Sequence, residues 1–141
     1  MTSMNEQLMA DGYRAWGGDD PFEDMIGPLF LKENADGTNR TAFYSERRHV
    51  NSGGALHGGM LMSFADYSLF AIARGQLDGP AVTVGFNSEF ISAVGAGHLI
   101  ESTGEVLRAT RSLLFVRGTV FTGEQTLLSF SGVLKRTSVR K

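Results

Sequence analysis

The feature that most constrains the fold of this chain is one long apolar segment near its middle. From Met60 to Ala73 nearly every side chain is apolar, and the pattern predicts a helix over about residues 58–74. A helix that is apolar on all sides cannot lie with one face in water, so the rest of the chain must enclose it. One carboxylate, Asp66, stands at its centre. Burying a lone carboxylate is costly, and proteins tend to retain such groups where they have a function.

The remaining sequence supplies strands that can enclose this helix. Four long alternating stretches follow it, separated by the turn-like segments "VGAG", "RATR" and "TGEQ", and they predict an antiparallel meander. In the first of these strands, alternation predicts one shared face for Val82, Val84, Phe86, Ser88 and Phe90. Two earlier strands are predicted over residues 27–33 and 40–50, around a turn at Asp36-Gly37.

These elements predict a single α+β domain of 141 residues. An antiparallel sheet of five or six strands over residues 27–141 should wrap around the one central helix. A short N-terminal helix over residues 3–16 and a connection should occupy residues 1–26. Such a sheet leaves edges that usually need pairing, so self-association is expected.

Composition excludes several classes of function. A net charge of -2, from 13 basic and 15 acidic side chains, gives no electrostatic footprint for nucleic acid. The chain has no cysteine, which excludes disulfides, thiolate catalysis and cysteine-ligated zinc. Three scattered histidines predict no metal site, and we expect His49 and His98 at the surface or in turns. No cofactor is expected.

Targeting signals are also missing from the sequence. Charged residues interrupt the apolar positions of the N-terminus, so it has no signal-peptide core. The longest apolar stretch is broken by Ser63, Asp66 and Ser68 and is shorter than the ~20 residues of a membrane span. We therefore expect a cytoplasmic protein without a membrane partner.

The segment "NSGGALHGG", directly before the long helix, is the strongest motif. His57, Gly58 and Gly59 stand at the helix start, where backbone N–H groups lack intrahelical partners and can receive an anion or oxyanion. Glycine there lets a ligand approach the backbone closely. Glycine pairs alone would indicate only a flexible loop. The full spacing N-x-x-G-x-x-H-G-G-x-x-x-x-x-A-D, from Asn51 to Asp66, is far more specific.

This spacing resembles the hotdog-fold acyl-CoA thioesterases, in the branch with the phenylacetyl-CoA thioesterases and the human Asp-dependent hotdog thioesterases. The resemblance covers about residues 27–136. It implies the hotdog fold, in which an antiparallel sheet wraps a central helix. It also implies hydrolysis of a medium-chain or aromatic acyl-CoA to the free acid and CoA.

The resemblance implies a role for each motif residue. Asp66 is the nucleophile or the general base for water, and the Gly58 backbone N–H polarises the thioester carbonyl. Asn51 lies near the same carbonyl and the attacking water, and His57 helps to place the thioester. Thr83 stands where relatives have a Ser or Thr hydroxyl that positions water beside the acid.

The phosphates of CoA call for basic side chains, which the turn "LRATRS" and the segment "LKRT" supply. The resemblance implies that pantetheine and nucleotide follow this hairpin, with Phe90 close by; the alternative is that these charges only solubilise a turn. The acyl group should lie against Met62, Phe64, Phe86 and Phe90. The expected substrate-binding residues are Gly59, Met62, Phe90, Arg108, Thr110, Arg111, Ser112 and Lys135, with Arg136 as a further cation.

The spacing of the motif also bears on assembly. His57 and Gly58 precede Asp66 by nine and eight residues, or roughly 13 and 12 Å of helical rise. Neither can meet one thioester carbonyl together with Asp66 of the same helix. A shared site would combine the helix start of one subunit with Asp66 and Thr83 of another, which predicts a homodimer with two equivalent sites. The resemblance implies further assembly into a homotetramer.

Two other functions remain open at this point. A non-catalytic acyl-CoA sensor on the same fold would keep the pocket but would not need Asp66. A hotdog hydratase would use an Asp and a His as acid and base. In such enzymes the His follows the Asp by five residues, whereas His57 precedes Asp66 here.

Overall fold

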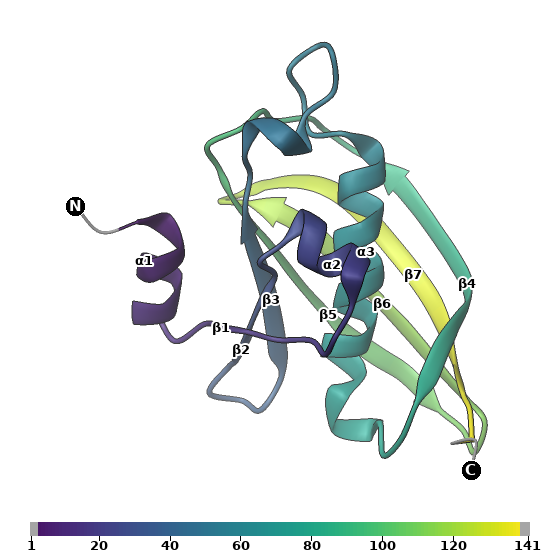
Figure 1. The fold of residues 1–141 in the computed structure, drawn as a ribbon. Coiled ribbons are helices and arrows are strands. Elements are labelled where there is room, and N and C mark those ends of the chain that lie inside the picture. The colour runs from purple at the N-terminus through teal and green to yellow at the C-terminus, as the bar shows by residue number, and fades with distance from the viewer. Residues whose placement is uncertain (1–2, 139–141) are drawn as a thin grey trace.

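The apolar segment forms the central helix α3, Gly58–Ala73, which is unbroken across the second half of the motif. The computed structural model describes residues 3–138, and in it the strands lie behind α3 and curve around it (Figure 1). His57 is the N-cap of α3, because its Nδ1 accepts a hydrogen bond of 2.8 Å from the Gly59 N–H. Within these residues, no helix is long and apolar enough to cross a membrane.

The sheet has seven antiparallel strands in the order β1-β2-β3-β5-β6-β7-β4. Their bounds are β1 Arg14–Ala15, β2 Phe30–Glu33, β3 Asn39–Tyr44, β4 Ala81–Phe90, β5 Leu99–Ala109, β6 Leu113–Thr122 and β7 Gln125–Arg136. The predicted α+β hotdog fold is confirmed. The strand count exceeds the predicted five or six because the two-residue β1 pairs with β2.

The predicted four-strand meander is wrong in one place. β4 pairs with β7 and not with β5, so it forms an edge of the sheet. The segment between β4 and β5 is a crossover and not a hairpin, because its backbone bonds to other loops. The Leu56 N–H donates to the Val94 carbonyl at 2.7 Å, and the Ser45 N–H donates to the His98 carbonyl at 2.9 Å.

The side chains of β4 do not all alternate onto one face. The register against β7 shifts between Thr83 and Gly85. Val82 and Val84 lie on the outer face, with 48% and 55% of their surface exposed. Past the shift, Phe86 packs against the core and stacks on Phe130, with ring centroids 6.5 Å apart. Because of the shift, even-numbered side chains point outward before Gly85, whereas Phe86 after it points toward the core.

The N-terminal part contains more structure than predicted. Helix α1 covers only Met4–Ala10, because the chain turns at Gly12, where φ is +97°. A second helix, α2 Pro21–Ile26, was not predicted. The N-cap of α2 is Asp20, whose Oδ1 accepts from the Glu23 N–H at 3.0 Å. Figure 1 shows α2 in front of α3, on the side away from the sheet.

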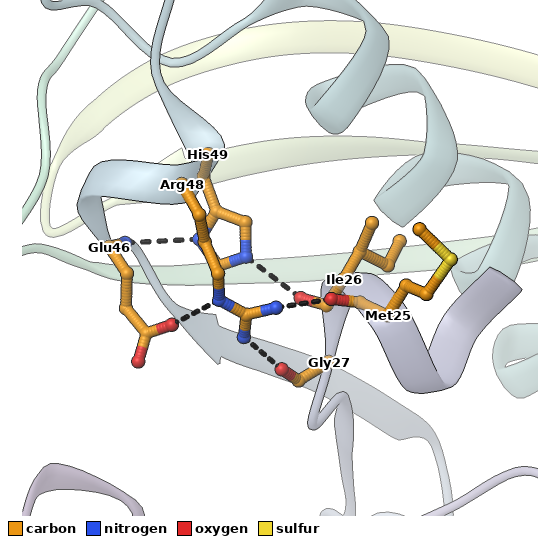
Figure 2. A network of polar contacts seen from close by, with 6 residues as sticks. All are labelled: Met25, Ile26, Gly27, Glu46, Arg48 and His49. Carbon is orange, nitrogen blue, oxygen red and sulfur yellow. Dashed lines mark hydrogen bonds and ion pairs between the residues drawn. The ribbon is translucent and has the colours of Figure 1, made fainter.

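Arg48 fastens α2 to the rest of the fold (Figure 2). It follows β3 in the short 3-10 helix η1, Arg47–His49. Its guanidinium donates to the carbonyls of Met25 and Gly27 at the end of α2. It also pairs with the Glu46 carboxylate at 2.6 Å. The last carbonyls of α2, which have no partner within the helix, are satisfied in this way.

His49 belongs to the same network, and the prediction that it lies at the surface is wrong. It is buried, its Nε2 lies 2.8 Å from the Ile26 carbonyl, and its Nδ1 accepts from the Glu46 N–H at 3.0 Å (Figure 2). Since Nδ1 accepts, Nε2 carries the proton that is donated to Ile26. Burial lowers the pKa of His49, which favours this neutral form. His98 is exposed in its turn, as predicted.

The core lies between α3 and the inner face of the sheet. Its large, fully buried side chains include Phe43, Phe64, Leu31, Leu69, Ile100, Leu114, Leu127, Leu128 and Leu134. Close contact needs a small residue under the helix, since a Cβ at Gly132 would lie 2.4 Å from Leu69 Cδ1. One stripe of α3 is less buried, at Gly59, Met62, Ser63, Asp66 and Phe70. The helix is therefore not enclosed on every side within one chain.

Candidate active site

Asp66 lies at the middle of the less buried stripe of α3 and is held by the sheet. The Thr83 hydroxyl on β4 donates a hydrogen bond of 2.7 Å to Asp66 Oδ1. This contact leaves Oδ2 free and sets the direction of the carboxylate. Thr83 was expected to position water beside Asp66; the two side chains are in direct contact, and the role of Thr83 stays a prediction. A fixed carboxylate beside open space can accept a proton from water or attack a carbonyl.

The start of α3 presents one free donor. His57 N-caps the helix, and its carbonyl accepts from the N–H groups of Met60 and Leu61, while its Nδ1 satisfies Gly59. Only the Gly58 N–H, among the first backbone donors of α3, has no hydrogen-bond partner within residues 3–138. It points outward at the positive end of a 16-residue helix, where negative charge is favoured.

Phe90 lies beside Gly58. A Cβ placed on Gly58 would be 3.1 Å from Phe90 Cζ, so the ring packs next to the first residue of α3. Phe90 is 55% exposed. Met62, two-fifths exposed, lies one turn further along the less buried stripe. Phe90 offers apolar surface beside Gly58, and Met62 offers apolar surface one helical turn before Asp66.

Asn51 organises the loop that leads to the motif. Its Oδ1 accepts from the N–H groups of Gly53 and Ala55, at 2.9 and 3.1 Å. The side-chain oxygen is thus used within the loop, and the side-chain amide N–H groups remain for a ligand. His57 and Asn51 both shape the helix start, so the structure gives each of them a local role besides the one expected from the resemblance.

Three exposed cations lie at one end of the sheet, two on the β5–β6 hairpin and one on β7, which pairs with β6 there. Arg108, Arg111 and Lys135 are exposed and form no ion pair with any residue between 3 and 138. The Thr110 hydroxyl accepts from the Leu113 N–H at 2.9 Å and closes the turn, beside the exposed Ser112.

Arg136, in contrast, is not a free cation for phosphate. It pairs with Asp78 at 3.2 Å and donates to the Gln76 carbonyl at 2.8 Å. The contact ties the end of β7 to the loop that follows α3 and the short 3-10 helix η2, Arg74–Gln76. Arg136 therefore has a structural role.

One chain does not bring the predicted residues into one site. Gly58 and Phe90 lie at the start of α3, whereas the three exposed cations lie where β5 ends, β6 begins and β7 ends. Phe90 is paired with Leu128, and Ala81, at the other end of β4, is paired with Arg136. The expectation that Phe90 lies close to the hairpin is therefore not met within a chain. Asp66 and Thr83 stand between the two ends.

The structure adds one acidic residue that the sequence analysis missed, Glu23 of α2. Burial, together with the charges of Asp20, Asp66 and Asp24, raises the pKa of Glu23 to about 7. Asp66 therefore acts electrostatically on Glu23 across the gap between the helices. In the described part of the chain, no group of three or more His, Asp or Glu side chains is arranged to hold a metal ion.

Comparison with known proteins gives the family. The model of the thioesterase superfamily matches residues 53–129, which include α3, Asp66 and Thr83. The chain belongs to the thioesterase superfamily. The prediction that it is a thioesterase is thereby confirmed at the level of the family.

Individual proteins similar to this superfamily member support the same assignment. The chain is 30% identical to a Pseudomonas aeruginosa protein named as an esterase, over 87% of this chain and 93% of that protein. It is also 30% identical to human acyl-coenzyme A thioesterase 13, over 82% of each chain. Among solved structures, it is similar to a mutant of the phenylacetic acid degradation protein PaaI of Thermus thermophilus. The TM-score is 0.72 and the identity 29%, over 84% of this chain and all of that one.

Proposed function

We propose that the protein hydrolyses the thioester of a medium-chain or aromatic acyl-CoA, with Asp66 as nucleophile or general base. The observation that carries the proposal is the carboxylate of Asp66, which Thr83 orients at 2.7 Å on the open stripe of an otherwise apolar helix. The similarity to a protein named as an acyl-coenzyme A thioesterase supports CoA as the thiol.

The chemistry follows from two groups. As a base, Asp66 takes a proton from water while the water oxygen bonds to the thioester carbon. The carbonyl oxygen becomes an oxyanion, which the free Gly58 N–H receives. The C–S bond then breaks, and the proton held by Asp66 passes to the thiolate. As a nucleophile, Asp66 would instead bond to the carbonyl carbon and expel the thiolate, which leaves an acyl anhydride. Water then hydrolyses the anhydride, and the proton that this releases passes to the thiolate. A single turnover in isotopically labelled water distinguishes the two, because only the anhydride route can leave label in Asp66.

The proposed site is shared between two subunits. The two groups are separated by roughly 12 Å of rise along one unbroken helix, so they cannot act on one carbonyl from one chain. The outer edge of β4 is unpaired, and the exposed Val82 and Val84 lie on it. Pairing two copies through this edge would cover apolar surface and bring the start of one α3 toward Asp66 of the other. Assembly into a homotetramer stays a prediction.

Release of free thiol from a panel of acyl-CoA esters tests the function. We expect turnover of medium-chain and aromatic esters. Tight binding of CoA without release from any ester would instead indicate a sensor. No observation favours the hydratase, since His57 Nδ1 is occupied by the Gly59 N–H, and His57 precedes Asp66 by nine residues where a hydratase has its His five residues after the Asp.

The CoA contacts give a prediction of their own. Replacing Arg108 and Arg111 with Ala should raise KM for CoA esters roughly 3- to 10-fold and leave kcat nearly unchanged, as exposed phosphate contacts bind substrate and transition state alike. A pantetheine thioester without the nucleotide should respond little. Arg117→Ala is the matched control, since this exposed arginine pairs with Glu105 on neighbouring strands. Equal losses on both substrates would move the CoA site elsewhere.

A further inference from the structure

A cavity of about 380 Å³ is lined by residues of α2 and the segment before it, of α3 and of the start of β4. Its walls come from three separate parts of the chain. Trp16 and Glu23 come from the N-terminal part, Tyr67 and Phe70 from α3, and Ala81 from the start of β4. A cavity of this volume is large enough for a compact acyl chain.

The cavity adjoins the candidate active site. Phe70 follows Asp66 by four residues, so it lies on the same face of α3, roughly 6 Å further along the axis. Ala81 precedes Thr83 by two residues and shares its face of β4. An acyl chain whose thioester lies at Asp66 and which extends toward the C-terminal end of α3 therefore enters this cavity.

Most polar groups in the cavity wall are already used. The Tyr67 hydroxyl donates to the Trp16 carbonyl at 2.8 Å, and the two rings pack edge to face at 5.6 Å. Asp20 Oδ1 caps α2 through the Glu23 N–H. The Glu23 carboxylate has no hydrogen bond and no basic partner among the described residues, and lies beside Gly17, where a Cβ would be 3.2 Å from its Oε1. Its two carboxylate oxygens are therefore available to a ligand, as is Asp20 Oδ2, which has no hydrogen bond among the described residues.

The position of Glu23 is fixed by the fold. The carbonyls at the end of α2 are bound by Arg48 and His49 (Figure 2). At its other end the helix is capped by Asp20. A short helix held at both ends keeps its side chains in place, so Glu23 can act on a bound acyl group selectively.

Resting on the proposed function, we propose that Glu23 determines acyl specificity: the site favours a compact acyl chain that ends in a hydrogen-bond donor and rejects one that ends in a carboxylate. An ionised carboxylate accepts a hydrogen bond from a distal hydroxyl or ammonium group. It repels a second carboxylate in a partly buried cavity, where charge interactions are stronger than in water.

The charge state of Glu23 makes the selectivity depend on pH. Burial, and then Asp20, Asp66 and Asp24, raise the pKa of Glu23 to about 7. The other ionisable groups that face this region are Tyr67, whose phenol pKa burial and Glu23 raise, and Arg14, which lowers it. Above pH 7 the ionised Glu23 rejects a distal carboxylate. Below it, the neutral acid can donate to one, so rejection weakens as the pH falls.

The test compares three esters of equal chain length: hexanoyl-, 6-hydroxyhexanoyl- and adipoyl-CoA. At about pH 8 we expect kcat/KM of the wild type to be at least ~10-fold higher for the hydroxyacyl than for the adipoyl ester, as one tenfold step needs only about 1.4 kcal/mol. Glu23→Gln should raise the adipoyl value by a similar factor and leave hexanoyl nearly unchanged. The ratio of adipoyl to hexanoyl should rise between about pH 8 and pH 6 in the wild type, and stay flat in the variant.

Asp24→Asn is the matched control, because Asp24 is an exposed acid on the same helix. Its loss lowers the pKa of Glu23, so at about pH 8, where Glu23 is already ionised, it should leave the ratios unchanged. Dissociation constants of the corresponding non-hydrolysable thioethers give the same ratios without turnover. They separate the two proposals: discrimination among thioethers without thiol release would refute hydrolysis and support the role of Glu23. Identical ratios in wild type and Glu23→Gln, by turnover and by binding, would overturn the inference.

Discussion

Asp66→Asn is expected to reduce thioester hydrolysis by at least about 10³-fold while the protein stays folded. The amide can still accept the Thr83 hydrogen bond, but it can neither take a proton from water nor attack the carbonyl. Thermal unfolding should show a stability that is unchanged or slightly raised, since the change removes a half-buried charge without an ion-pair partner.

The control for Asp66→Asn is Asp24→Asn, which removes the same charge from an exposed position and should keep full activity. A second readout is the titration of Glu23, observed by NMR. Because Asp66 helps to raise the pKa of Glu23, that pKa should fall in Asp66→Asn. Near wild-type hydrolysis by Asp66→Asn would show that Asp66 is structural.

The second large effect is expected at Gly58. Gly58→Pro removes the free N–H and should lower kcat by about 10²–10³, the usual loss for one oxyanion donor. Proline suits the first position of a helix. The preceding His57, with φ -62° and ψ 134°, already has the extended conformation that precedes proline. The variant should therefore fold.

Gly58→Ala separates the donor from the side chain. It adds a Cβ that meets Phe90 at 3.1 Å but keeps the N–H. The exposed Phe90 ring can move aside, so we expect a loss of only a few-fold. The difference in kcat between the Pro and Ala variants then measures the donor. Equal losses in both would mean that crowding by Phe90 and not the N–H explains the effect.

Sequence patterns predicted the elements that depend on local signals. The apolar run defined α3, and the HGG motif placed His57 and Gly58 at its start, because N-capping and glycine at a helix start are local properties. The need to enclose an apolar helix predicted the wrapped sheet. The resemblance placed a hydroxyl at Thr83 beside the acid, and in the structure this hydroxyl donates directly to Asp66.

The errors arose where distant contacts decide the structure. β4 was paired with β5 because the turn-like "VGAG" lies between them, whereas hydrogen bonds to Ser45 and Leu56 make that segment a crossover. His49 was expected at the surface or in a turn, but it is buried and bonds the end of α2. Helix α2 itself had a local signal that was overlooked, an Asp N-cap followed by Pro21 and, three residues after the cap, Glu23.

The central claim is a site shared between two subunits, and co-expression of Gly58→Pro with Asp66→Asn tests it most directly. Each variant alone should be nearly inactive. In a mixed dimer, the subunit with intact Gly58 and the subunit with intact Asp66 form one complete site, while the other site carries both changes. With equal expression about half of the dimers are mixed, so activity should return to about a quarter of the wild-type value. Activity that stays at the level of the parent variants, with mixed dimers shown to form, would contradict the shared site.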